Sequence, residues 1–261
     1  MNPTTIITAF FDINRAEKGD GRTLEEYFQW GKKTLQLNCY LFVVTEPKFE
    51  SFFRENRPPN LPMTLKIMDF KDNHYYRYYD KIKQITNSSY YKNKVAHPNR
   101  VECILPEYNI IQYSKFHYLQ IAIEENPYQS SHFLWIDLGA SRFFNNLDVL
   151  KPYPSLKGQM ILNNSKPQLF AQRRYDLFHY PIDDNFIWKA DNLIYGGTFG
   201  GSAEIILNIS KEIEHIFVSE MLEKQNVNNE QLALALLWKK KTEWFHLITD
   251  SNCLYTFHYF T

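Results

Sequence analysis

The residues of this chain that are best placed for chemistry come at the ends of predicted strands, and Asp137 is the clearest of them. It directly follows the apolar run Phe133–Ile136, and Gly139 stands two residues later. This pattern predicts a buried strand that ends in a tight turn. A buried, unpaired carboxylate is costly, so Asp137 needs a cation, a hydrogen-bond donor or water. It therefore either faces a ligand beyond the carboxyl ends of a sheet or caps the following turn, and both interpretations stay open.

Three further charged residues are candidates for the same site. Asp12 and Arg15 follow the β-rich run Thr4–Phe11, so they come at the end of a first strand. Lys115 lies in a helix that opens at Pro106, and it projects away from the apolar face of that helix. Lys115 points either toward the ligand crevice or into solvent, and solvent is the default for an isolated lysine.

Glu230 is a candidate at the start of a late helix. Asn228 followed by Gln231 resembles a cap for a helix over Asn229–Trp238. Glu230 then stands in the first turn, where the helix dipole stabilises the ionised carboxylate. It is either a hydrogen-bond partner or base in a site, or a routine stabiliser of the helix.

Glycine is concentrated in the stretch Leu193–Ser202, which reads LIYGGTFGGS. Four of the nine glycines stand here, namely Gly196, Gly197, Gly200 and Gly201. Glycine is favoured where the backbone adopts positive φ or approaches a ligand closely. The spacing fits neither GxGxxG nor the Walker pattern. It favours a sugar-sized platform over a β-bulge and turn.

The elements that must position these residues alternate as in an α/β protein with a parallel sheet. Strands are predicted at Thr4–Phe11, Tyr40–Thr45, Thr64–Met68 and Phe133–Ile136, and helices at Thr23–Leu37 and from Pro106 to Ile123. Later strands are predicted at Met160–Leu162, Gln168–Gln172, Trp244–Ile248 and Cys253–Phe260, and an amphipathic helix at Ala203–Leu222. The tyrosine-rich segment Asp69–Arg100 reads as an exposed excursion in preference to a mobile flap.

Composition restricts the class of partner and the compartment. Lys plus Arg and Asp plus Glu both number 29 in 261 residues, so no global field attracts nucleic acid. Cys39, Cys103 and Cys253 are odd in number and widely spaced, which fits a reducing cytoplasm and no disulfide framework. No signal peptide and no apolar run of about 20 residues is visible. We expect a cytoplasmic protein whose contact with a membrane is peripheral.

An ordered set of motifs resembles the HtrL/YibB family of bacterial proteins over nearly the whole chain. The motifs are TAFFDINR (Thr8–Arg15), YFQWGKKTL (Tyr27–Leu35), YSKFHYL (Tyr113–Leu119), WIDLGASRF (Trp135–Phe143), GGTFGGS (Gly196–Ser202) and NNEQLALALLW (Asn228–Trp238). The resemblance implies a GT-A-like α/β fold, a mixed sheet flanked by helices whose N-terminal half is Rossmann-like. It implies one domain over residues 1–261, with a nucleotide-binding half at 1–137 and an acceptor half at 138–261.

The resemblance also implies an activity. It is that of a glycosyltransferase that moves a hexose from a nucleotide diphosphate sugar, UDP-linked by expectation, to a lipopolysaccharide, lipooligosaccharide or related glycan or glycolipid at the inner membrane. Asp137 matches the first acid of a DxD motif that holds Mn²⁺ or Mg²⁺, but Gly139 replaces the second acid. Either His246 or His258 completes the metal site, or Lys and Arg replace the metal.

The remaining roles follow the same resemblance. Glu230 matches the acid that receives the acceptor proton. The residues matched to donor binding are Thr8, Phe10, Asp12, Arg15, Lys115, Gly196, Gly197 and Gly200. The alternative function is a non-catalytic glycan-binding or scaffold protein on the same fold. A metal-dependent phosphoesterase is disfavoured, because no cluster of Asp and His is visible.

Overall fold

The computed structural model describes residues 3–144, 148–174, 177–189, 191–249 and 255–261. Seven strands form one mixed sheet in the order β3-β2-β1-β4-β6-β5-β7. Their bounds are β1 Thr4–Phe10, β2 Tyr40–Thr45, β3 Met63–Ile67, β4 His132–Ile136, β5 Leu169–Arg173, β6 Ile194–Ser202 and β7 Phe245–Thr249. The α/β class and the predicted strands of the N-terminal half are confirmed, and the sheet contains strands from both halves of the chain.

The order of the strands reverses at β1. The chain runs outward through β2 and β3 on one side of β1, and then places β4 on the other side, parallel to β1. Strand β6 is antiparallel to both β4 and β5. In open α/β sheets, ligands bind beyond the carboxyl ends of the strands at such a reversal. The crevice between the ends of β1 and β4 is therefore the expected position of a site.

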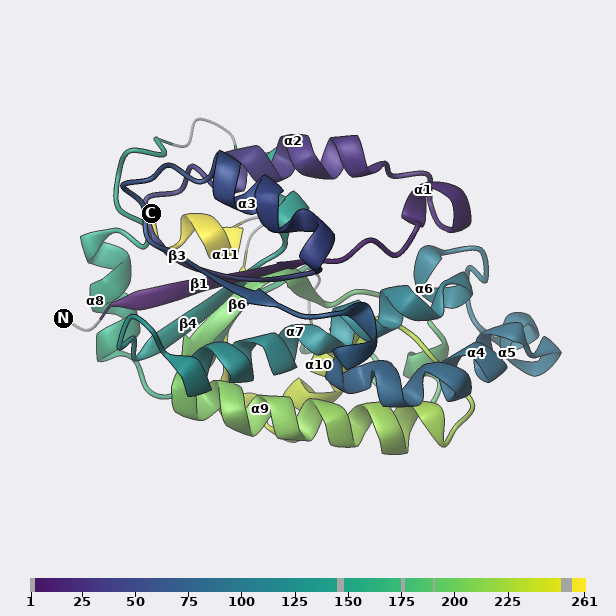
Figure 1. The fold of residues 1–261 in the computed structure, drawn as a ribbon. Helices are drawn as coiled ribbons and strands as arrows, with labels where there is room; N and C mark the ends of the chain where they lie inside the picture. The colour runs from purple at the N-terminus through teal and green to yellow at the C-terminus, as the bar shows by residue number, and fades with distance from the viewer. Residues whose placement is uncertain (1–2, 145–147, 175–176, 190, 250–254) are drawn as a thin grey trace.

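Helices cover both faces of the sheet (Figure 1). One face carries α2 (Leu24–Thr34), α3 (Glu50–Asn56) and α11 (Tyr255–His258), and the other carries α7 (Pro106–Glu125), α9 (Ala203–Ile216) and α10 (Glu230–Lys240). Successive strand residues point to opposite faces, so Ile6 packs in the core beneath α2 and Ile7 in the core beneath α7. The predicted capping box between Thr23 and Glu26 is present at the start of α2.

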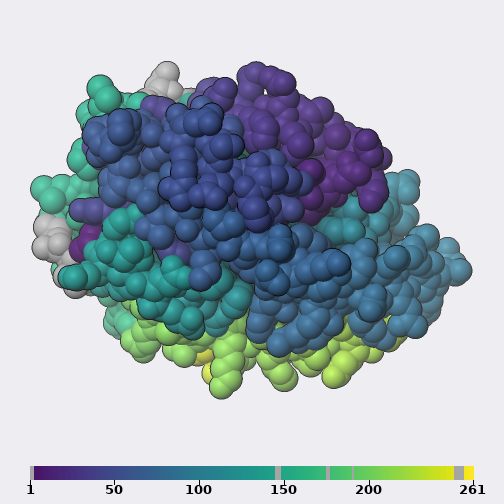
Figure 2. Space-filling model, viewed as in Figure 1, coloured from purple at the N-terminus to yellow at the C-terminus, as the bar shows by residue number. Residues whose placement is uncertain are grey.

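The segment expected to be an exposed excursion is a helical lobe. It contains two 3₁₀ turns, α4 (Tyr79–Asn87) and α5 (Ser89–Lys94), and is followed by α6 (Val101–Ile104). The lobe projects from one end of the molecule (Figure 2), yet Tyr75 and Tyr91 are buried in the core. The Tyr75 ring packs against those of Tyr113 and Phe217. The tyrosines of this segment therefore contribute to a core between helices: Tyr75 and Tyr91 are buried in it, and Tyr76, Tyr78 and Tyr79 pack against it.

Two predicted strands are wrong, and one helix begins later than predicted. Residues 160–162 lie within α8 (Leu156–Asn164), whose N-cap Ser155 accepts a hydrogen bond from the Gly158 amide. In the predicted strand over Cys253–Phe260, residues 255–258 form helix α11 and residues 259 and 260 lie in a turn; residues 253 and 254 lie outside the described residues. At the late helix the N-cap is Asn229, one residue beyond the predicted Asn228. Helix α9 continues through a π-helical turn to Leu222, as predicted.

Candidate functional site

A cavity of about 580 Å³ opens at the carboxyl ends of β1 and β4. It is lined by the loop 12–15 after β1, the loop 137–142 after β4, and residues 196–197 of β6. Lys115 of α7 and Glu230 of α10 close its inner end. The topological reversal therefore brings together candidates that are distant in sequence.

Asp137 faces this cavity with a side chain that is 39% exposed. Its Oδ1 accepts hydrogen bonds from Trp135 Nε1 at 2.7 Å and lies 3.1 Å from Lys115 Nζ. Its backbone amide donates to the Gly197 carbonyl at 2.8 Å, which fixes the end of β4 against β6. The side chain makes no capping hydrogen bond to the 3₁₀ turn that follows. The Asp137 backbone does cap this turn, because its carbonyl accepts from the Ala140 amide at 2.8 Å, and the side chain is left to face the cavity.

Lys115 points into the site, contrary to the solvent-facing default. Its side chain is 2% exposed, and Nζ lies 2.7 Å from Glu230 Oε1 and 3.0 Å from the Gly196 carbonyl oxygen. Asp137 Oδ1 completes the surroundings of the ammonium group as an ion pair at 3.1 Å. Burial alone would lower the pKa of Lys115, but the carboxylates of Asp137 and Glu230 reverse this effect and raise it. Lys115 therefore stays charged and links the two acids.

Glu230 is fully buried at the first position of α10. Burial raises the pKa of this carboxyl above its ordinary value, although Lys115 acts in the opposite direction. Its second oxygen, Oε2, has no hydrogen-bond partner among the described residues. The role of Glu230 as the acceptor of a substrate proton stays a prediction; its side chain lines the cavity and is 1% exposed.

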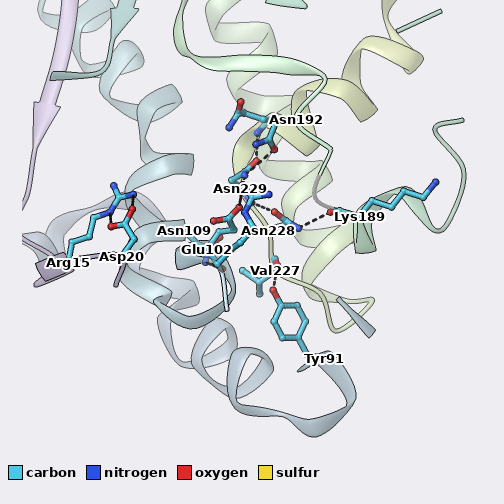
Figure 3. Close-up of polar contacts among 12 residues, drawn as sticks. Arg15, Asp20, Tyr91, Glu102, Asn109, Lys189, Asn192, Val227, Asn228 and Asn229 are labelled. Atoms are coloured by element: carbon cyan, nitrogen blue, oxygen red, sulfur yellow. Dashed lines mark hydrogen bonds and ion pairs between the residues drawn. The ribbon is translucent and has the colours of Figure 1, made fainter. Parts of the chain in front are cut away.

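A network of amides fixes the start of α10 and therefore Glu230 (Figure 3). The Asn229 side chain accepts from the Gln231 amide at 3.1 Å, and its Nδ2 is 3.2 Å from both Glu102 Oε1 and Asn192 Oδ1. Asn228 Nδ2 donates to the Lys189 carbonyl in the same cluster (Figure 3). Two other segments of the chain, one at Glu102 and one at Lys189 and Asn192, therefore hold the start of the helix that carries Glu230.

Gly196 allows this arrangement because it has no side chain. A Cβ atom at this position would overlap Glu230 Oε1 and lie 2.9 Å from its Cδ. A Cβ atom added to Gly197 would lie 2.6 Å from the Tyr195 ring. The two glycines line the cavity from within β6, where the pairing with β5 shifts register between Ala171↔Phe199 and Arg173↔Ile194. The strand is therefore irregular here, as the β-bulge alternative expects, and the sugar-sized platform stays a prediction.

The variant Gly196→Ala should lower the free energy of unfolding by about 1–3 kcal/mol, because the added methyl group forces the buried carboxylate to move. Urea denaturation measures this change. In the background Glu230→Ala the carboxylate is absent, and the same glycine substitution should then cost less. An equal cost in both backgrounds would show that the glycine is required for another reason.

The other predicted donor-binding residues divide into two groups. Phe10, Asp12 and Arg15 line the cavity. Arg15 is bound in two places to Asp20 at 2.6 and 2.8 Å, as Figure 3 shows, and to the Tyr27 hydroxyl at 2.7 Å. Arg15 therefore fixes the loop that follows β1. Burial lowers the pKa of Arg15, but the carboxylate of Asp20 and the Tyr27 hydroxyl help to raise it above its ordinary value.

Thr8 and Gly200 do not line the cavity. Thr8 is fully buried within β1. Gly200 lies in the pairing of β6 with β4, where a Cβ atom would overlap the Phe133 carbonyl oxygen. Both residues stabilise the sheet that carries the site.

The two histidines predicted as metal ligands are also elsewhere. His246 stands in the edge strand β7, three strand spacings from β4, which is about 14 Å. Its ring packs against Phe170, and burial lowers the pKa of both His246 and His258. Neither residue lines the cavity. Across the described ranges, no three His, Cys, Asp or Glu side chains are grouped as metal ligands. The ligand set of Asp137 with these histidines is thus a wrong prediction.

Sequence reasoning missed Arg142, which lines the cavity five residues after Asp137. Its guanidinium lies over the rings of Trp30 at 4.8 Å and Phe143 at 4.5 Å. The signal was present in the motif WIDLGASRF, where a basic residue follows the acid within one short loop. Tyr27, Tyr108 and Tyr195, which also line the cavity, carry no comparable signal among 18 tyrosines.

Fold and site together define an α/β protein with a ligand cavity at the reversal point of a mixed sheet. The chain belongs to the family described as "Bacterial protein of unknown function (HtrL_YibB)", whose model matches residues 2–261. It is 26% identical over 213 residues to Protein HtrL of Escherichia coli (strain K12), covering 76% of this chain and 71% of that protein. Within the described part of the chain, no helix is both long and apolar enough to cross a membrane.

Proposed function

We propose that this protein is a glycosyltransferase of the GT-A type that uses a nucleotide diphosphate sugar, and we expect the nucleotide to be UDP. It transfers the hexose to a surface glycan or glycolipid of the lipopolysaccharide class. The observation that carries this proposal is the exposed Asp137 carboxylate beside buried Lys115 in a cavity at the switch point. Acidic and basic groups at the point where the strand order reverses can bind and orient a polar ligand.

The size and lining of the cavity support a ligand of this class. A volume of about 580 Å³ lies within the range of small-molecule sites, about 300–1,000 Å³. Tyr27, Tyr108 and Tyr195 line it and offer aromatic faces. Such faces stack on a base or on the apolar side of a sugar ring.

The transfer requires one bond to form and one to break. The oxygen of the acceptor hydroxyl bonds to the anomeric carbon, the bond from that carbon to the phosphate oxygen breaks, and the nucleoside diphosphate leaves with the electron pair. The hydroxyl proton passes to a base, for which Glu230 stays the candidate. The free oxygen of Asp137 stabilises the positive charge that develops on the sugar in the transition state.

The carboxylate oxygens of Asp137 and Glu230 do not form a dedicated site for a divalent cation. Asp137 Oδ1 is bound by Trp135 and Lys115, and Glu230 Oε1 is bound by Lys115. The second oxygen of Asp137 and the buried Oε2 of Glu230 are left, whereas a dedicated cation site has several oxygen ligands. The steps above therefore involve only groups of the chain and the substrates.

A thermal-shift panel tests the proposed function. Wild-type protein is heated with UDP, UDP-glucose, UDP-galactose, GDP-mannose, or oligosaccharides without a nucleotide. Ligand at 100 times its Kd should stabilise the native state by about 2.7 kcal/mol and raise Tm by about 5–10 °C. We expect this shift for at least one nucleotide sugar. A shift with oligosaccharides alone would favour the glycan-binding alternative, and no shift with any nucleotide would refute the transferase.

A further inference from the structure

Four cationic residues line the cavity, namely Arg15, Arg22, Lys115 and Arg142. Among the described residues, Arg142 is the one of them that forms no ion pair with a carboxylate, since Arg22 lies 3.4 Å from Asp20. A guanidinium has five N–H donors. Within the described part of the chain, its one hydrogen bond goes from Nη1 to the Gly139 carbonyl oxygen at 3.1 Å. Lys115 donates to Gly196 and Glu230 and forms an ion pair with Asp137. Arg15 is bound by Asp20 and Tyr27.

The Arg142 guanidinium also crowds the position from which a side chain of residue 139 would start. A Cβ atom added to Gly139 would lie 2.9 Å from Arg142 Nη1 and 3.2 Å from the Trp30 ring. A side chain at position 139 and the observed guanidinium therefore compete for one place. Where a DxD motif would place a second carboxylate and its metal, this chain places a fixed positive charge.

The loop that carries Arg142 is held firmly against α2. Thr34 Oγ1 donates to the Leu138 carbonyl at 3.0 Å, and the Ser141 hydroxyl donates to the Trp30 carbonyl. The guanidinium then lies over the Trp30 ring. A cation held by its surroundings before the ligand arrives loses less entropy on binding.

From these contacts we infer that Arg142 binds the diphosphate of the donor directly and that no divalent cation is needed for this binding. The inference rests on the proposed function and specifies how its donor is held. A planar guanidinium with adjacent free N–H groups bonds two phosphate oxygens at once. It offsets the charge of the leaving diphosphate, which in DxD enzymes the metal does.

The test is isothermal titration of UDP, GDP and ADP, and of the matching nucleosides, into wild-type protein in EDTA and in Mn²⁺. We expect at least one diphosphate to bind with a Kd that agrees within about twofold between the two buffers. Arg142→Gln should weaken that binding by about 10- to 100-fold, the effect of one or two hydrogen bonds to a charged group. Binding of the matching nucleoside should not change, because it has no phosphate.

Two further variants separate recognition from general effects. Gly139→Ala adds a methyl group 2.9 Å from Nη1, so the guanidinium must shift. This variant should weaken diphosphate binding in the same direction while leaving Arg142 in the chain. Arg54→Gln removes the same charge from the surface of α3, where Arg54 pairs with Glu50, and should leave binding unchanged. Circular dichroism confirms that each variant is folded.

Each contrary result has a distinct meaning. Diphosphate binding that appears only with Mn²⁺ overturns the inference and leaves the proposed function intact. Metal-free binding that Arg142→Gln does not weaken also overturns it. If none of the diphosphates binds in either buffer, both the inference and the proposed function are refuted.

Discussion

Asp137→Asn should lower the turnover of a nucleotide sugar by at least about 100-fold, comparable to the loss of one preorganised electrostatic group in an active site. Asparagine keeps the shape of the side chain and can still accept from Trp135 and Lys115. It removes the negative charge that faces the cavity. The measurement is release of nucleoside diphosphate from the donor that wild-type protein uses, with and without an acceptor.

This variant should remain folded, because its side chain is 39% exposed and Lys115 keeps Glu230 as a partner. Its free energy of unfolding should change by less than about 1 kcal/mol. Asp80→Asn, an exposed acid in the first turn of α4, is the control for an acid-to-amide change. Turnover close to that of wild type would remove Asp137 from the reaction.

The sequence was sufficient to predict the first half of the fold and the position of the cavity. Strands such as β2 (Tyr40–Thr45) are continuous apolar runs, and their order with the intervening helices indicates a parallel sheet. Asp137 was identifiable because a carboxylate at the end of a buried strand needs a partner. Both signals are local, and local patterns are what a single sequence contains.

The parts that were not predictable depend on contacts between distant segments. The direction of Lys115 is set by Glu230, which is 115 positions away, and a single helix cannot reveal it. The burial of Glu230 depends on Gly196, whose missing side chain leaves room for the carboxylate. His246 was assigned to the site because nothing in the sequence shows that β7 is an edge strand.

Lys115→Met should be the most destabilising change in the site, lowering the free energy of unfolding by about 3–5 kcal/mol. Methionine keeps most of the apolar stem but leaves Glu230 as a buried charge without a cation, because Glu230 is 0% exposed. Urea denaturation at pH 7.5 measures the change. The matched control is Lys66→Met, whose partner Glu125 is 2.7 Å away but 38% exposed. This control should cost less than about 1 kcal/mol.

The double variant Lys115→Met with Glu230→Gln tests the cause of that loss. Glutamine removes the buried charge and keeps the shape of the side chain. If the unpaired carboxylate is responsible, the double variant should be more stable than Lys115→Met alone, since the cycle isolates the interaction of the pair. A double variant as unstable as the sum of the two single variants would assign the loss to packing.

The pH dependence of Lys115→Met gives a second, independent test of the same cause. Burial already raises the pKa of Glu230 in the folded protein, and Lys115 opposes this effect. Without the lysine the folded-state pKa rises further above the unfolded value, so the folded state binds more protons than the unfolded state. Stability then increases as the pH falls. The deficit relative to wild type should therefore be smaller at pH 5 than at pH 7.5, whereas a deficit equal at both values would mean that the charge of Glu230 plays no part in it.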